Sequence, residues 1–234
     1  MKHTKMETTE DIIKIISSDR ERTNILRKYE QAFIAFLVQR VPLWISSDML
    51  TGIGFFGNII VFLSFLLAAY ISKYYLLIGV FGFMISWFGD SLDGRIAYYR
   101  KKPRKWYGFS LDITTDWIGI IFVGLGFILY VNHRFVIIGY AFIVLYGWEM
   151  ITSILRYKIT GNYSIDSGIF GPTEVRIIVS IILLLEVIAT GSIHYVGALI
   201  VVGLLISNAF SFKSLLKQAD EFDKKEKHSH NESS

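Results

Sequence analysis

The chain has 234 residues, of which 53% are hydrophobic and 19% are charged, and its mean hydropathy is +0.46. This composition excludes an ordinary soluble domain, and several apolar runs are about 20 residues long, enough to cross a roughly 30 Å hydrocarbon core. The absence of cysteine excludes disulfides, thiolate metal sites and a cysteine nucleophile, while the formal charge of +4 is modest and we expect no nucleic acid partner.

Residues 1–45 precede the first long apolar run and are predicted to form an interfacial segment on the cytoplasmic side. Between positions 23 and 41 the apolar residues recur mostly every three or four positions, accompanied by arginine and lysine. This pattern is typical of an amphipathic helix that lies in the membrane interface with its basic side chains toward the lipid headgroups. A helix packed on the protein's own loops is the alternative.

Six apolar segments follow, so the predicted fold class is an all-α membrane protein with six transmembrane helices and an N-terminal interfacial amphipathic helix. The six segments lie near 49–71, 75–98, 109–130, 135–155, 174–190 and 195–214. They belong to one transmembrane domain, 46–216, and residues 217–234 form a polar cytoplasmic tail that extends the last helix. No internal repeat or second domain is evident.

The placement of the basic residues predicts the orientation of this multi-pass integral membrane protein. If the N-terminus is cytoplasmic, only Lys73 and Arg134 of the 24 lysines and arginines fall at the outer face. The reverse topology would break the positive-inside rule. We therefore expect the basic loop 99–108 and both chain ends to lie in the cytoplasm.

Four aspartates flank this basic loop, and a carboxylate at a membrane usually marks a function. Asp90 and Asp93 lie on one face at the end of the second span, and Asp112 and Asp116 share a face at the start of the third. A hairpin between the spans would bring the pairs together, where a divalent cation relieves their repulsion. Oxygen ligands favour magnesium, manganese or calcium, and magnesium commonly bridges carboxylates to substrate phosphates. Solvated helix ends are the alternative.

The stretch GDSLDGRIAYYRKKPRKWYGFSLDITTD, residues 89–116, resembles the signature of the CDP-alcohol phosphatidyltransferase family. That signature runs D-x-x-D-G-x-x-A-R, a short linker, then G-x-x-x-D-x-x-x-D, and its two parts align with residues 90–98 and 108–116. Residues 47–52 also resemble the segment where the family's first span begins beside the nucleotide. The chain departs from the pattern at Tyr98, where the family usually has arginine, and its linker is one residue longer. Arg95, Arg100 and Arg104 are the candidates to replace that arginine.

The resemblance implies that the transmembrane domain is catalytic and uses Mg²⁺ or Mn²⁺. Enzymes of this family displace CMP from a CDP-linked lipid or alcohol donor with the hydroxyl of an alcohol acceptor, and the expected donor here is CDP-diacylglycerol. It also implies a homodimer among membrane lipids, with the active site at the cytoplasmic face. By position, the metal ligands would be Asp90, Asp93, Asp112 and Asp116, with Asp116 also the catalytic general base. The donor would be bound by Asp48, Thr51, Gly94, Arg95, Ala97 and Gly108.

Three cations on the cytoplasmic side, Arg156, Lys158 and Arg176, are candidates to bind a phosphorylated acceptor, and their alternative role is to anchor the topology. Glu149 and Glu186 are unusual within predicted spans. Each has either a functional role or hydrogen bonds inside the bundle.

Three other functions remain open from the sequence. An intramembrane prenyltransferase would share the magnesium–diphosphate chemistry, but its aspartate motifs lack the D-G-x-x-A element. A non-enzymatic divalent-cation transporter would continue its acids toward the outer face, which Glu186 alone hardly does. The tyrosine at position 98 also leaves room for an inactive homologue.

Overall fold

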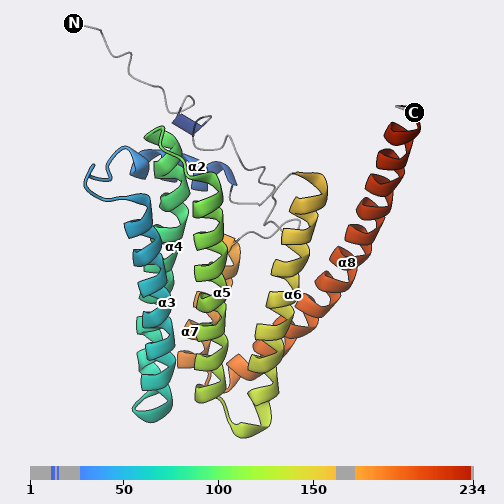
Figure 1. Ribbon diagram of the computed structural model, residues 1–234. Coiled ribbons are helices and arrows are strands. Elements are labelled where there is room, and N and C mark those ends of the chain that lie inside the picture. The colour runs from blue at the N-terminus through green and yellow to red at the C-terminus, as the bar shows by residue number, and fades with distance from the viewer. Residues whose placement is uncertain (1–11, 14, 16–26, 162–171, 233–234) are drawn as a thin grey trace, which may run out of the picture.

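The computed structural model describes residues 12–13, 15, 27–161 and 172–232, and within these ranges the chain forms helices and short connections but no strand (Figure 1). The predicted all-α class is thereby confirmed. In chain order the helices are α2 (Arg27–Val38), α3 (Ser47–Tyr70), the 3-10 helix η1 (Lys73–Tyr75), α4 (Leu76–Tyr99), α5 (Lys105–Tyr130), the 3-10 helix η2 (His133–Phe135), α6 (Val136–Thr160), α7 (Pro172–Ile188) and α8 (Ser192–Glu232).

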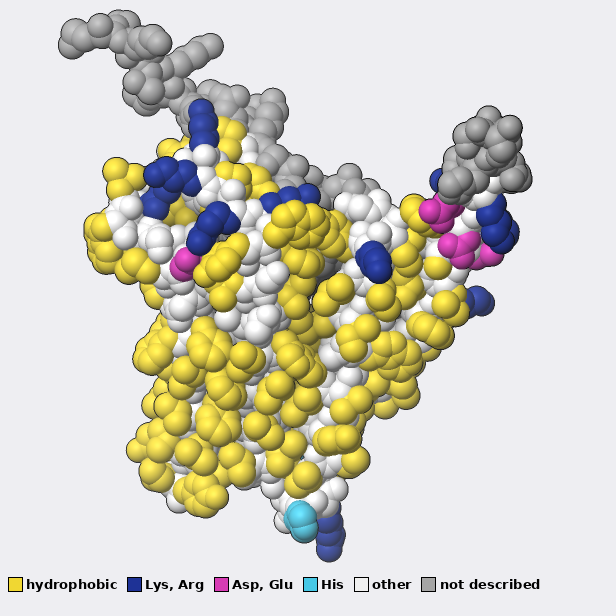
Figure 2. All heavy atoms as spheres, in the orientation of Figure 1, with side chains coloured by type: hydrophobic (Ala, Val, Ile, Leu, Met, Phe, Trp, Pro, Cys, Tyr) yellow, Lys and Arg dark blue, Asp and Glu magenta, His cyan; other side chains and the backbone are white. Residues whose placement is uncertain are grey.

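Five helical stretches in the described part of the chain are long and apolar enough to cross a membrane, as expected for an integral membrane protein. They are Ser47–Tyr70, Lys73–Tyr99, Lys105–Tyr130, His133–Thr160 and Ser192–Lys227. Helix α7 has 17 residues, about 26 Å of helix at 1.5 Å per residue, so it is shorter than the others. A sixth span therefore stays a prediction. On the face that Figure 2 shows, hydrophobic side chains cover the body of the bundle, while lysine and arginine gather toward the end that carries α2.

The α4–α5 connection is shorter than predicted, and α6 runs to Thr160 rather than to about 155. The connection between α4 and α5 is only residues 100–104, because α4 closes at Lys101, whose φ is 56°, and Pro103 cannot continue it. Helix α5 then begins four residues earlier than expected. At the other end of the chain, α8 is one continuous helix of 41 residues, and its polar part carries i,i+4 ion pairs such as Lys224 with Asp220.

Helices α3 and α4 approach each other closely because glycines meet at their interface. A Cβ atom built on Gly89 would lie 2.3 Å from the amide nitrogen of Gly54 and 2.4 Å from the carbonyl oxygen of Leu50. Gly57 is similarly close to Gly82, whose carbonyl oxygen would lie 2.6 Å from the added Cβ. Small residues let membrane helices pack backbone to backbone. This contact fixes the position of Asp90, the residue that follows Gly89, relative to α3.

The helix α2 lies across the end of α3 and α4 (Figure 1). Its residues Ile34 and Val38 are buried in a cluster that includes Leu92 and Ile96 of α4. On its other face Phe33 is 50% exposed, so the helix packs on the protein and also presents an aromatic surface. This amphipathic helix was predicted, and its position in a membrane interface stays a prediction.

Glu186 lies at the end of the bundle opposite α2 and is fully buried. Its carboxylate accepts hydrogen bonds from the hydroxyl of Tyr130 at 2.9 Å and from the amide groups of Gly191 and Ile193, each at 2.9 Å. Gly191 has a φ of 96°, which an L side chain rarely adopts, and this turn directs its amide toward the carboxylate. These contacts favour the structural alternative for Glu186, which joins the α7–α8 turn to α5.

Candidate metal centre and substrate site

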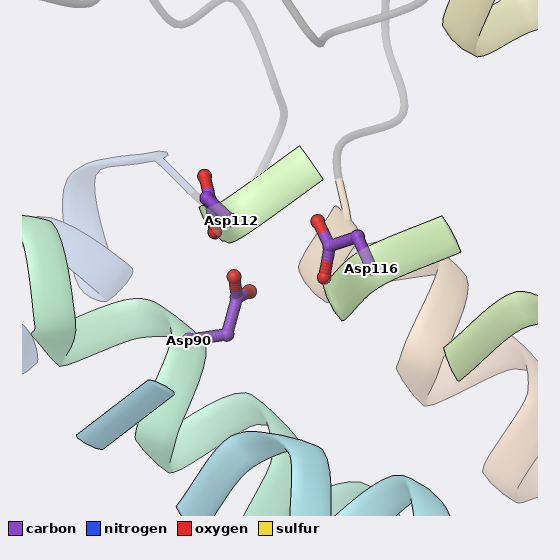
Figure 3. Close-up of side chains that lie close together, drawn as sticks. All are labelled: Asp90, Asp112 and Asp116. Carbon is purple, nitrogen blue, oxygen red and sulfur yellow. The ribbon is translucent and has the colours of Figure 1, made fainter. Parts of the chain in front are cut away.

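Three of the four aspartates converge at the α4–α5 hairpin. One carboxylate oxygen from each of Asp90, Asp112 and Asp116 lies within 4.8 Å of the other two, and the three side chains point toward one another (Figure 3). Asp90 comes from α4, and the other two come from successive turns of α5. Asp112 is 8% exposed, whereas the side chains of Asp90 and Asp116 are 23% and 34% exposed. The prediction that the hairpin brings the aspartates of α4 and α5 together is therefore confirmed for these three residues.

This group fits a hard divalent cation. Carboxylate oxygens are the ligands that magnesium and manganese prefer, and three of them at this separation can contact one ion. Three like charges this close in a partly buried place repel one another, and a cation removes that repulsion. Asp90, Asp112 and Asp116 are accordingly the residues that could hold a metal ion.

Asp93 lies one turn further along α4 and outside this group of three. It is buried, and its Oδ2 atom accepts a hydrogen bond from the hydroxyl of Thr51 at 2.7 Å, while Ser47 donates to its carbonyl oxygen at 2.9 Å. Residues three apart on a helix are about 60° apart around the axis, so Asp93 faces α3 while Asp90 faces α5. A role for Asp93 as a metal ligand stays a prediction.

Arg176, on α7, contacts two members of the aspartate group. Its Nη1 atom lies 2.6 Å from Oδ2 of Asp90, and its Nη2 atom lies 3.8 Å from Oδ1 of Asp116. The side chain of Arg176 is 16% exposed, so this ion pair is shielded from solvent. Of the three cations expected to bind the acceptor, Arg176 is the one that the structure brings to the aspartates.

The other two predicted acceptor cations lie elsewhere on α6. Arg156 donates to the carbonyl oxygen of Ser211 across the α6–α8 contact at 3.5 Å, and the hydroxyl of Ser211 lies 3.4 Å from Glu149. Lys158 is exposed. Within the described ranges, neither Arg156 nor Lys158 forms an ion pair with an aspartate of the group, and Glu149 belongs to the α6–α8 contact.

The predicted donor residues lie on α3, α4 and the start of α5. Asp48 forms an ion pair with Arg104, and this hydrogen bond raises the pKa of Arg104 above its usual value. The guanidinium of Arg104 also lies 4.1 Å from the ring centre of Tyr107. Gly108 is exposed and a Cβ atom there would meet nothing within 4 Å, so no packing contact explains a glycine at that position. Gly94 and Ala97 are both half-buried on α4.

All three candidates to replace the missing arginine at position 98 have partners in the structure. Arg100 donates to the carbonyl oxygens of Val41 at 3.1 Å and Pro42 at 2.9 Å, and so holds the loop before α3. Arg104 pairs with Asp48. Arg95 donates to the carbonyl oxygen of Ser91, one turn back on its own helix.

The structure adds contacts near the site that the sequence did not predict. The indole of Trp87 donates to the hydroxyl of Thr173 at 3.0 Å, and that hydroxyl donates to Glu30 at 3.0 Å, so α4, α7 and α2 are joined. These residues are far apart in the chain, and no local pattern relates them.

The family model described as CDP-alcohol phosphatidyltransferase matches residues 44–207, from just before α3 into α8. The matched region contains all four aspartates and Arg176. No individual curated protein matches the chain.

Proposed function

The chain belongs to the CDP-alcohol phosphatidyltransferase family, and on that premise we propose that it is a phospholipid synthase whose donor is CDP-diacylglycerol. The family is a phosphotransferase family of phospholipid biosynthesis, in which a phospho-alcohol group passes from a CDP-linked donor to an alcohol acceptor with the help of a divalent metal. Membership argues against the prenyltransferase and transporter alternatives. The observation that carries the proposal is the convergence of Asp90, Asp112 and Asp116 within the matched region.

In the proposed site Asp90, Asp112 and Asp116 hold Mg²⁺ or Mn²⁺, with Asp93 as the fourth ligand. The bound ion supplies positive charge that neutralises the donor's phosphates and the departing nucleotide. The support from this chain is the set of three oxygen donors within 4.8 Å of one another.

The proposed reaction forms one phosphorus–oxygen bond and breaks another. The acceptor's hydroxyl oxygen attacks the phosphorus that carries diacylglycerol, and the bond from that phosphorus to the bridging oxygen breaks, so CMP leaves with the electron pair. The hydroxyl proton passes to the carboxylate of Asp116, the general base, and then to water. Asp116 suits this role because its side chain is 34% exposed and lies beside the other two acids.

Residues around the aspartates would bind and orient the two substrates. Arg176 is the best supported acceptor residue, since it already contacts two of the acids. Arg95 is the proposed cation for the donor phosphates in place of the arginine missing at position 98. The remaining proposed contacts are Asp48, Thr51, Gly94, Ala97 and Gly108 for the CDP group, and Arg156 and Lys158 for the acceptor.

We also propose that α7 is a sixth span and that the aspartates lie at the cytoplasmic face of a homodimer. The distribution of lysine and arginine supports this orientation, because they gather toward the end that carries α2 (Figure 2). A lipid donor could then keep its acyl chains in the bilayer while its headgroup reaches a water-soluble acceptor. Residues 46–216 would form the catalytic domain, with 1–45 and 217–234 on the cytoplasmic side.

The test is a screen for CMP release by the purified protein. CDP-diacylglycerol and Mn²⁺ would be combined with glycerol 3-phosphate, inositol phosphate, inositol and serine in turn, with CDP-ethanolamine plus diacylglycerol as the parallel donor. We expect CMP release with CDP-diacylglycerol and one acceptor class. If CMP were released from CDP-ethanolamine plus diacylglycerol but not from CDP-diacylglycerol with any acceptor, the donor assignment would be overturned. If no donor–acceptor pair gave CMP release, the protein would be an inactive homologue.

A further inference from the structure

The guanidinium of Arg176 lies within ion-pair distance of two of the three carboxylates that would have to share a metal ion. It contacts Asp90 at 2.6 Å and Asp116 at 3.8 Å, and all three acids lie within 4.8 Å of one another. A bound guanidinium directs its hydrogens at the carboxylate lone pairs that a metal ion also requires. Asp90 and Asp116 would therefore be ligands of the proposed metal ion as well as partners of the Arg176 guanidinium.

The base of Arg176 is held in place while its side chain is long enough to move. Thr173, one turn earlier on α7, is joined to Trp87 of α4 and to Glu30 of α2 by hydrogen bonds of 3.0 Å each. These contacts anchor the start of α7 against the bundle. A change of partner by the guanidinium therefore requires only side-chain rotation and no helix movement.

We propose that Arg176 is the counter-ion of the metal-free site and that it competes with the divalent ion for Asp90 and Asp116. Binding of the ion and the ion pair between Arg176 and Asp90 then exclude each other, and the released guanidinium becomes available to a substrate anion. This inference rests on the proposed role of the aspartates as metal ligands.

The physical reason is that both cations draw on the same negative charge. An ion entering the group must break the contact of Arg176 with Asp90 and is repelled by the guanidinium while it remains there. The competing explanation is that Arg176 stays in place and orients Asp90, as outer partners of metal ligands commonly do. The two explanations predict opposite effects on metal affinity when Arg176 is replaced.

The deciding measurement is Mn²⁺ affinity without donor or acceptor, followed by the electron paramagnetic resonance signal of free Mn²⁺. The purified full-length protein would be compared with Arg176→Gln, which removes the charge and keeps a long polar side chain. The control is Lys102→Gln, which removes one positive charge from an exposed position in the α4–α5 loop. Activity plays no part in this readout.

We expect Arg176→Gln to tighten Mn²⁺ binding by about 10- to 100-fold, the range that corresponds to one hydrogen bond to a charged group. Lys102→Gln should leave the affinity within about twofold, because exposed charges are screened. Weaker or unchanged binding by Arg176→Gln would overturn the proposal, and so would an equal gain in Lys102→Gln.

Two further observations keep the proposal falsifiable if the glutamine variant folds poorly. Arg176→Lys keeps the charge and loses the two-pronged contact, so it should tighten Mn²⁺ binding by a smaller factor, and weakening would contradict competition. In thermal unfolding, saturating Mn²⁺ should raise the Tm of either variant more than that of the unsubstituted protein.

The outcomes also separate this inference from the proposed function. Absence of Mn²⁺ binding in all proteins would overturn the metal assignment and the inference together. Mn²⁺ binding that is equal in the variant and the unsubstituted protein would overturn only the competition. Failure to release CMP with intact Mn²⁺ competition would overturn only the proposed reaction.

Discussion

The glycine contact between α3 and α4 offers a direct test of how the fold positions the aspartates. In Gly89→Ala the added Cβ atom would lie 2.3 Å from the amide nitrogen of Gly54 and 2.4 Å from the carbonyl oxygen of Leu50, whereas ordinary contact begins near 3.4 Å. The atoms that it meets are backbone atoms, so no side-chain rotation can relieve the overlap. The two helices must separate by a substantial fraction of an ångström or more.

The size of the effect follows from two opposing terms. Overpacking of this kind destabilises by about 1–3 kcal/mol, and a clash with backbone belongs at the upper end of that range. Alanine is a better helix former than glycine by about 0.5–1 kcal/mol, which offsets part of the loss. We therefore expect a net destabilisation of about 2 kcal/mol, or a decrease in Tm of about 4–8 °C for a chain of this size.

The assay is thermal unfolding in detergent, with Gly203→Ala as the matched control. A Cβ atom on Gly203 meets nothing within 4 Å, so the same chemical change there should leave Tm unchanged or slightly higher. Because Asp90 directly follows Gly89, the variant should also bind Mn²⁺ more weakly. If Gly89→Ala were as stable as Gly203→Ala, the close approach of α3 and α4 would not be a feature of the folded protein.

Three more predictions concern the site and the opposite end of the bundle. Asp116→Asn should lower CMP release by about 10²- to 10⁴-fold with little change in Tm, and full activity would refute the general-base assignment. Glu186→Gln should lower Tm, because a glutamine amide cannot accept from all of the donors around that buried carboxylate. The rate of CMP release should stay within about twofold of that of the unsubstituted protein. An unchanged Tm would contradict the structural role of Glu186. Chelation of divalent ions by EDTA should abolish CMP release, and added Mn²⁺ or Mg²⁺ should restore it; release that persists after chelation would contradict metal dependence.

Local sequence patterns predicted the parts of the structure that depend on composition and spacing. The apolar runs located the helices to within a few residues for most of the chain, and the spacing of four between Asp112 and Asp116 correctly placed them on one face of α5. The hairpin was correctly expected to bring Asp90 to that face. These features follow from helix periodicity and need no knowledge of distant contacts.

The features that the sequence did not predict all depend on contacts between distant residues. The spacing of three put Asp90 and Asp93 on one face, but α3 decides which neighbour each meets, and Thr51 binds Asp93 while Asp90 faces α5. The sequence does not rank Arg176 above Arg156 and Lys158 as an acceptor cation. Only the packing of α7 against α4, which brings Arg176 to Asp90 and Asp116, singles it out. No local pattern encodes that choice.

The acidic side chains at the two ends of the bundle have different surroundings, and this difference bears on function. At one end the single carboxylate of Glu186 is satisfied by neutral hydroxyl and amide donors, which shows that this fold can hold an acid without a second charge. At the other end three carboxylates face one another within 4.8 Å, and neutral donors cannot remove repulsion between like charges. Cations relieve this repulsion, and Arg176 brings one positive charge to Asp90 and Asp116. A divalent ion that displaced Arg176 would bring two positive charges to the group, which is the physical reason to assign the proposed chemistry to this end of the protein.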